Sequence, residues 1–392
     1  MQQRFFLSPI AVFILAILLA LAACKKDDTV VIDPVQPSDA EIISKYLHID
    51  LNAPGNYANP LYPVHYDANV LASDNAPSIN TVTDNGALLG RVLFYDKNLS
   101  LNNTVACASC HIQQKGFTDD KRLSEGFTGG LTGAHSMRLA NANFYTGERM
   151  FWDKRAADVE DQVTRPIKDH VEMGFDDSAG GIDSLLRKMR KLEYYPVLFK
   201  QAFGTSDITE NSMKLALAQF VRSIQSTGSK FDEGFAQVFN PAQPNGAANL
   251  PFPNFTQMEN TGKNLFLAPP NAGGAGCAGC HQPPTFALAA NSRSNGLDAG
   301  ETVVFKAPSL KNIGVAGPYM HDGRFNTLNE VVEHYNSGIQ LSPALDNRLV
   351  GPNGQPLRLN LNNNQKQALV AFLNTLTDNS LMADEKFGNP FK

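Results

Sequence analysis

Hydrophobic residues recur with helical spacing along most of this chain. Apolar side chains three and four positions apart predict amphipathic helices, whereas the alternation typical of strands is confined to short pieces such as 302–305. The predicted helices are at 158–165, 182–203, 209–226, 328–335 and 364–376. The pattern therefore predicts an all-α protein.

The N-terminus carries one long apolar stretch. Arg4 precedes an apolar run over 5–23, which ends in Leu-Ala-Ala directly before Cys24. A transmembrane helix has a similar length of about twenty residues. Small residues before a cysteine instead resemble the lipobox of bacterial lipoprotein signal peptides, in which the cysteine is lipidated after cleavage. We predict a signal peptide at 1–23, a tether at 24–40, and a protein of the cell envelope that is lipid-anchored on the periplasmic or outer-membrane side.

Composition and charge narrow the class of protein. The chain has 392 residues, of which 43% are hydrophobic and 18% charged, so it can fill the cores of two ordinary domains and is not disordered. Its net charge of −5, without a basic block beyond the N-terminus, argues against a nucleic-acid partner. The cysteine count of five is odd, and lipidation of Cys24 would account for one of them.

The other four cysteines form two copies of the motif Cys-x-x-Cys-His. The motif residues are Cys107, Cys110, His111, Cys277, Cys280 and His281. Two disulfides or a four-cysteine zinc site would use the same cysteines, but neither explains a histidine after each pair. Attachment of haem c explains it, because two thiols bind the vinyl groups and the histidine binds the iron. We therefore predict two covalently bound haem c groups.

The two motifs also mark an internal repeat. A similar apolar segment precedes each motif, at 90–94 and at 262–266. This repeat predicts two cytochrome c-like helical domains, each around one haem, at 41–240 and 255–392. The Pro- and Asn-rich segment between them is typical of a linker.

Residues between the haem motifs carry a more specific resemblance. The only tryptophan, Trp152, stands in the sequence Phe-Trp-Asp-Lys-Arg-Ala, and Gln162, Pro166 and Glu172 follow it. The segment 318–323 reads Pro-Tyr-Met-His-Asp-Gly. In these motifs and their offsets the chain resembles the bacterial di-haem cytochrome c peroxidases and their MauG relatives.

The resemblance extends over about 85–377 and implies a role for each matching residue. It makes the first domain peroxidatic and the second an electron-transfer domain. Trp152 is implied to pass electrons between the haems, Glu172 to be the acid/base of the first haem pocket, Gln162 to hydrogen-bond beside it, and Pro166 to shape the cavity. A carboxylate near the iron suits this role, because cleavage of a peroxide O–O bond needs a proton moved between its oxygens. Without the haem motifs, a lone Trp and a Glu would be interpreted as core and salt-bridge residues.

The chain departs from the family at the first haem. Phe127 stands sixteen positions after His111, where family members that need reductive activation carry a histidine ligand. His135 could take its place through a longer loop, or could be a surface or supporting histidine. Without such a ligand the first haem would be open, as in the MauG relatives.

Two residues are the main candidates for the distal ligand of the second haem. Tyr335 occupies the position of the methionine of the peroxidases and matches the tyrosine of the MauG group, so we favour it. Met320 is the competing ligand, and His321 and His334 are weaker candidates.

The family also implies one further ion and several partners. A calcium ion between the domains would use the carbonyl oxygens of Ala316 and Pro318. The predicted function is reduction of hydrogen peroxide to water, with electrons from a small redox protein such as a cytochrome c or a copper protein. The alternatives are a MauG-like oxidase of a partner protein and a di-haem electron carrier. Family members often form homodimers, and the lipid anchor is the expected membrane contact.

Overall fold

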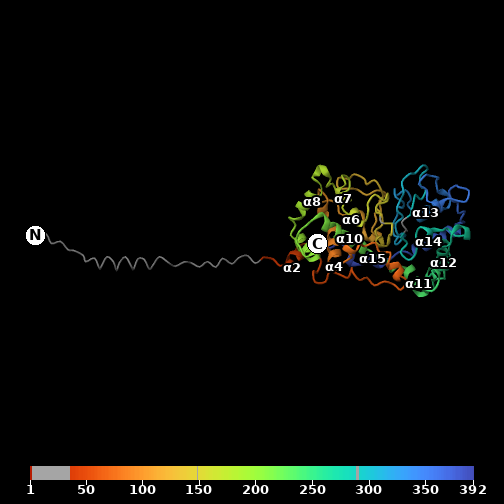
Figure 1. The fold of residues 1–392 in the computed structure, drawn as a ribbon, viewed down its shortest axis with the longest axis horizontal. Helices are drawn as coiled ribbons and strands as arrows, with labels where there is room; N and C mark the ends of the chain where they lie inside the picture. The colour runs from red at the N-terminus through yellow and green to blue at the C-terminus, as the bar shows by residue number, and fades with distance from the viewer. Residues whose placement is uncertain (2–35, 148, 288–290) are drawn as a thin grey trace. The chain divides into compact units, whose positions relative to one another are not determined.

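The computed structural model describes residues 1, 36–147, 149–287 and 291–392. The chain divides into two units, Met1–Ser38 and Asp39–Lys392, and the helical fold lies in the second (Figure 1). The predicted signal peptide and Cys24 lie outside the described residues. No helix in the described ranges is both long and apolar enough to span a bilayer.

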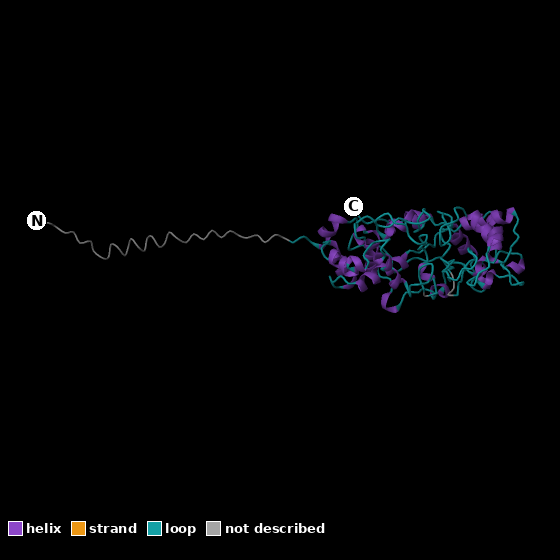
Figure 2. Cartoon of the chain, turned by 90° about the horizontal axis from the view of Figure 1, so that it is seen from above, coloured by secondary structure: helices purple, strands orange, loops and turns teal. Residues whose placement is uncertain are grey.

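Short helices joined by long loops build the second unit (Figure 2). The α-helices are α2 (Asp39–Tyr46), α3 (Ala68–Leu71), α4 (Asp84–Tyr95), α5 (Cys107–Cys110), α6 (Val159–Gln162), α7 (Arg165–Lys168), α8 (Gly181–Met189), α9 (Tyr194–Phe203), α10 (Glu210–Ser223), α11 (Lys230–Val238), α12 (Gln257–Leu267), α13 (Leu328–Glu333), α14 (Asn363–Asn374) and α15 (Asn379–Ala383). The described residues contain only isolated β-bridges, and 302–305 is a loop. The predicted helical fold class is confirmed.

Prolines explain where the structure divides two predicted helices. The segment 158–165 forms α6 and then α7, with Pro166 in the first turn of α7, where a missing N–H costs no hydrogen bond. The segment 182–203 forms α8 and α9, and Pro196 lies in the first turn of α9. Helix α13 ends earlier than predicted and continues as the π-helical turn η9 (His334–Gly338).

The two haem motifs lie in structurally equivalent halves. Helix α4 packs on α10 in the first half, and α12 packs on α14 in the second. A glycine allows each close crossing, because a Cβ atom at Gly90 would overlap the carbonyl oxygen of Ala216, and one at Gly262 would overlap that of Ala368. The glycines of the two apolar segments that precede the motifs therefore have the same packing role.

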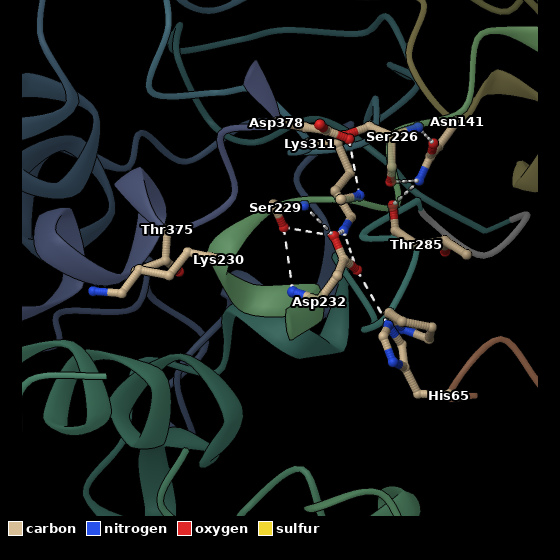
Figure 3. A network of polar contacts seen from close by, with 12 residues as sticks. His65, Asn141, Ser226, Ser229, Lys230, Asp232, Thr285, Lys311, Thr375 and Asp378 are labelled. Carbon is tan, nitrogen blue, oxygen red and sulfur yellow. Dashed lines mark hydrogen bonds and ion pairs between the residues drawn. The ribbon is translucent and has the colours of Figure 1, made fainter. Parts of the chain in front are cut away.

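Two buried asparagines repeat a second feature of the halves. Asn141 and Asn312 both have left-handed backbones, with φ of 61° and 62°. The Oδ1 atom of Asn141 accepts a hydrogen bond from the backbone of Ser226, and that of Asn312 accepts one from Asp378, both at 2.7 Å. The halves meet here, because Ser226 Oγ donates to Asp378 Oδ2 at 3.1 Å (Figure 3).

A buried ion pair lies close to this junction. Lys311 Nζ lies 2.6 Å from both carboxylate oxygens of Asp232 on α11, and both side chains are at most 1% exposed (Figure 3). His65 Nε2 lies 3.2 Å from the same carboxylate, and Ser229 Oγ donates to it at 2.6 Å. Burial alone would raise the pKa of Asp232, but Lys311 and the hydrogen bonds lower it overall.

Two clusters of aromatic and aliphatic side chains form the cores of the two halves. The last residues of the chain pack with the first cluster rather than the second, through Leu381 and Phe387. Gln113, close after the first haem motif, donates a hydrogen bond of 3.0 Å to the Leu381 carbonyl. The boundaries 41–240 and 255–392 stay a prediction, and the return of the C-terminal tail was not predicted.

Candidate haem sites

The first motif places its histidine in a fixed orientation. Helix α5 carries both cysteines, and His111 follows as its C-cap. The Nδ1 atom of His111 lies 3.1 Å from the carbonyl oxygen of Phe117 and 3.1 Å from Ser136 Oγ. These contacts leave Nε2 as the ring atom for a metal. Burial lowers the pKa of His111, so the imidazole is neutral, which is the form that binds iron.

The second motif repeats this arrangement. The Nδ1 atom of His281 lies 3.4 Å from the carbonyl oxygen of Phe286, and burial lowers the pKa of His281 to about 4. Phe286 and Phe117 both have a left-handed backbone, with φ of 52° and 61°, which turns each carbonyl toward its histidine. The two histidines are therefore held by equivalent backbone contacts.

Among the described residues, the geometry supports neither of the two other uses of the motif cysteines. All four cysteines are free thiols. Within the described ranges, the one group of side chains that could together hold a metal ion is Asp298, Glu301 and His321, and it contains no cysteine. Its Asp298 is already paired with Arg324, at 2.9 and 2.7 Å. Paired thiols next to a neutral imidazole fit haem c attachment.

A cavity of about 960 Å³ adjoins the second motif. Cys277, Cys280 and His281 line it, together with apolar side chains such as Leu369 and Leu373. This volume is in the range of cofactor and ligand pockets. A haem fits this cavity, because two thiols can attach it, a neutral imidazole can bind its iron and the walls are apolar.

Both candidate distal ligands of the second haem line this cavity. Tyr335 lies in the π-helical turn η9, a feature that is common at functional sites. Burial raises the pKa of Tyr335, and a hydrogen bond with Asn295 opposes this rise. Asn295 also donates to the sulfur of Met320 at 3.3 Å. Tyr335 and Met320 both contact Asn295, so the preference for Tyr335 as the distal ligand stays a prediction.

Glu172 lies near the first haem motif. It is partly buried, and it is close enough to the thiols of Cys107 and Cys110 to raise their pKa values. Burial, with a contribution from Asp169, raises the pKa of Glu172 to about 7, although Arg155 opposes this. The carboxylate forms no hydrogen bond or ion pair with the described residues. A carboxyl group with these properties can exchange a proton at neutral pH.

Of the two other residues predicted for this pocket, the structure brings Phe127 to the backbone of Glu172. Phe127 N donates to the backbone oxygen of Glu172 at 3.0 Å, and its ring lies so close to Gly174 that a Cβ there would overlap it. Phe127 therefore packs on the loop that carries Glu172, as its alignment with the family ligand implies. Gln162 ends α6 and forms no hydrogen bond with Glu172.

Trp152 connects the surroundings of the two motifs. Its Nε1 atom donates to the His135 carbonyl at 2.7 Å, and its ring lies 6.5 Å from the ring of His321. It also lines the second haem cavity. The next residue, Ser136, contacts His111. One residue therefore lies between the carbonyl that accepts the Trp152 hydrogen bond and the predicted iron ligand of the first haem.

His135 is not placed to bind the first haem iron. Its side chain is 4% exposed, and both ring nitrogens have protein partners. Nδ1 lies 3.0 Å from the Lys121 carbonyl and Nε2 3.3 Å from Thr118 Oγ1. His135 is therefore a supporting residue, and Ser136, which follows it, contacts His111.

The predicted calcium site does not fit the residues present. The buried guanidinium of Arg138 donates a hydrogen bond to the Ala316 carbonyl, one of the two expected ligands. A fixed positive charge at that oxygen would repel a calcium ion. The prediction of calcium at Ala316 and Pro318 is therefore not carried further.

Two residues of the sites were not found from the sequence. Ser136 contacts His111, and Asn295 contacts the candidate distal ligands. Neither belongs to a motif. The one signal in the sequence was that Ser136 directly follows His135, a candidate haem ligand.

Two equivalent helical halves, each with two thiols and a neutral histidine, define a di-haem protein of the c type. Comparison with known proteins gives the family. Residues 84–238 match the family model of di-haem cytochrome c peroxidases and MauG proteins. Residues 84–238 carry the domain of this family, relatives from the family are similar to most of the chain, and the family implies two haem c cofactors.

Relatives of both kinds are similar to the chain. Methylamine utilization protein MauG of Methylophilus methylotrophus is 28% identical over 322 residues, which cover 78% of this chain and 86% of that protein. Cytochrome c551 peroxidase of Nitrosomonas europaea is 29% identical over 311 residues, covering 74% and 79%.

Solved structures agree with the fold. A MauG-like protein associated with microbial copper homeostasis has a TM-score of 0.66 at 27% identity, covering 81% of this chain and 96% of that one. The di-haem peroxidase BthA of Burkholderia thailandensis has a TM-score of 0.60 at 18% identity, covering 79% and 91%. The protein is thus an oxidoreductase of the di-haem peroxidase type.

Proposed function

We propose that the protein reduces hydrogen peroxide to water with electrons from a small redox protein, a cytochrome c or a copper protein. The observation that carries this proposal is the Glu172 carboxyl group. It lies near the first haem motif, has no hydrogen-bond partner in the described residues, and has a pKa raised to about 7. Raised carboxyl pKa values in partly buried pockets are typical of catalytic acids and bases.

Haem bound at the first motif would supply an iron centre that binds peroxide and exchanges electrons. The task of Glu172 is to move a proton. It accepts the proton of one peroxide oxygen and returns it to the other, which leaves as water. Two further protons and two electrons complete reduction to two water molecules. Gln162 is proposed to orient the peroxide beside Glu172.

Trp152 is proposed to lie on the electron path between the sites. Its hydrogen bond to the His135 carbonyl and its position on the second haem cavity support this role. The donor protein would bind near the second site. Dimerisation, which is common in the family, stays a prediction.

A MauG-like oxidase of a partner protein is the second candidate. Phe127, which cannot bind iron, lies beside Glu172 and favours a first haem that is open without prior reduction. Tyr335 on the second cavity favours the same class. Similarity to both MauG proteins and a cytochrome c551 peroxidase leaves the two functions as alternatives. A carrier without chemistry has less support, because it would need no raised carboxyl pKa.

Two kinetic measurements separate these functions. Rapid mixing of the holoprotein with peroxide should change the haem spectrum at once, and a carrier would not respond. Steady oxidation of reduced cytochrome c by peroxide would support the peroxidase. A fast peroxide response without turnover would contradict the peroxidase and support the partner-protein oxidase.

We also propose that the protein is exported and anchored by lipid at Cys24. The Leu-Ala-Ala sequence before this cysteine supports the proposal. Labelling with a radioactive fatty acid in a bacterial host should mark the wild-type chain and not the Cys24→Ser variant. Equal labelling of both, or none of the wild type, would contradict lipidation.

A further inference from the structure

Two buried cations line the cavity next to the second haem motif. Lys306 is 6% exposed and Arg138 is 9% exposed, and both belong to the lining of the cavity. They come from different halves of the protein, since Arg138 follows soon after the first motif and Lys306 after the second. Buried cations are normally paired with carboxylates.

Lys306 has only weak partners in the described part of the chain. Its Nζ atom donates to the sulfur of Met150 at 3.2 Å and lies 4.2 Å from the centre of the Tyr145 ring. The neighbouring charge is Lys154, which has the same sign. A thioether and an aromatic ring do not satisfy the three donors of an ammonium group. Burial and then Lys154 lower the pKa of Lys306 to about 7.

Arg138 also lacks partners for some of its hydrogen-bond donors. One of its terminal nitrogens donates to the Ala316 carbonyl, and its guanidinium lies 5.7 Å from the centre of the Tyr319 ring. Its Nε atom is buried without a hydrogen-bond partner. Burial lowers the pKa of Arg138 to about 10. Like Lys306, it has no carboxylate partner among the described side chains.

Several other buried or partly buried cations among the described residues have stronger partners. Lys263 donates to two backbone carbonyls at 2.6 Å, Lys311 pairs with Asp232, and Arg348 pairs with Asp346 at 2.7 Å. The fold thus provides partners for buried positive charge elsewhere. Lys306 and Arg138 differ in that both border the haem cavity.

We propose that Lys306 and Arg138 hold the two propionate carboxylates of the haem in this cavity. Haem carries two such groups, which matches the two buried cations of the cavity lining that have no carboxylate partner among the described side chains. One cation comes from each half, so binding of this haem would also stabilise the contact between the halves. The proposal depends on haem occupancy, which the family implies, and not on whether the protein is a peroxidase or an oxidase.

The pairing should raise the reduction potential of this haem. A nearby positive charge stabilises the form with the added electron, so its loss favours the oxidised form. Replacement of Lys306 or Arg138 by methionine should therefore lower the potential. The expected change is about tenfold or more in the reduction equilibrium, because the charge lies in a site of low dielectric constant.

The test uses the holoprotein, with haem content checked at two per chain. An EPR-monitored redox titration at pH 7 gives the potential of each haem, and resonance Raman spectra report the propionate bending bands. Lys306→Met and Arg138→Met should each lower the potential of the second haem and shift these bands. Lys306→Arg, which keeps the charge, should stay close to wild type. If Lys306→Met does not fold, Lys306→Gln removes the charge and keeps a donor.

Lys154→Met is the matched control. Lys154 is a neighbouring cation, but its ammonium donates to the Ser292 carbonyl at 2.6 Å. Its replacement should change the potential much less and leave the propionate bands in place. Unchanged bands and potential in the neutral Lys306 variant, or an equal shift in Lys154→Met, would overturn the proposal.

Discussion

The indole nitrogen of Trp152 donates a hydrogen bond of 2.7 Å to the backbone carbonyl of His135. The next residue, Ser136, touches the imidazole of His111, while the Trp152 ring borders the cavity of the second motif. A single side chain therefore reaches from the peptide beside one haem ligand to the pocket of the other haem.

Replacement of Trp152 by phenylalanine should slow electron transfer between the sites and leave the first site intact. The smaller ring loses both the hydrogen bond and part of the contact with the cavity. We expect steady turnover with reduced cytochrome c to fall by about tenfold or more, while the first spectral response to peroxide keeps its rate. Stopped-flow and steady-state assays measure the two. Parallel loss of both rates would indicate a structural role instead.

Glu172→Gln should remove the pH dependence of the reaction with peroxide. With a pKa of about 7, the wild-type carboxylate becomes available as a base as the pH rises through neutrality. The wild-type rate should increase from pH 6 to pH 8, and the variant rate should be flat and lower by roughly 10²–10⁴-fold. Glu125→Gln, at an exposed carboxylate bonded to Lys121, is the control and should keep the wild-type profile.

Glu172→Gln should also stabilise the protein against unfolding at high pH. The folded-state pKa of Glu172 lies above that of the unfolded chain, so wild-type stability falls as the pH rises from about 4.5 to about 7. Glu172→Gln should remove this loss and gain roughly 1–3 kcal/mol at pH 8 relative to pH 4, allowing for partial exposure. Denaturant unfolding of the wild-type and Glu172→Gln holoproteins at pH 4 and pH 8 measures this gain. If the variant differs from wild type by the same free energy of unfolding at both pH values, the pKa of Glu172 is not raised.

Tyr335→Phe should change the spectrum and potential of the second haem, and Met320→Leu should leave them near wild type. A phenol oxygen can bind iron, whereas phenylalanine cannot, so loss of the ligand alters the coordination. EPR and visible spectra of the oxidised holoproteins report the change. A changed spectrum in Met320→Leu, with none in Tyr335→Phe, would assign the ligand to Met320.

Asp232→Asn should destabilise the protein by about 3–5 kcal/mol, because Lys311 would stay buried without its counter-charge. Glu193→Gln breaks an exposed pair with Lys45 and should cost much less, because solvent screens both charges. Unfolding in denaturant, followed by circular dichroism, compares the two variants. Equal losses would mean that the buried pair contributes no more than a surface pair.

The sequence was sufficient where chemistry follows from residue type and spacing. Two Cys-x-x-Cys-His motifs predict two haems, because a thiol pair and the next histidine reach one haem whatever surrounds them. Helical periodicity gave the fold class, and α10 and α14 appear almost where predicted. The helix breaks near Pro166 and Pro196 were less clear, since a proline is tolerated in a first turn and so does not mark the boundary itself.

Tertiary structure decided everything that depends on residues distant in the chain. The backbone contacts that fix His111 and His281, the position of Trp152 against His135, and the hydrogen bonds that occupy both nitrogens of His135 come from loops without periodicity. The guanidinium of Arg138 excludes calcium from the Ala316 carbonyl, although nothing in the local sequence places them together. Periodicity and motifs record local geometry and covalent chemistry, whereas the partners of a buried charge are set only when the two halves pack.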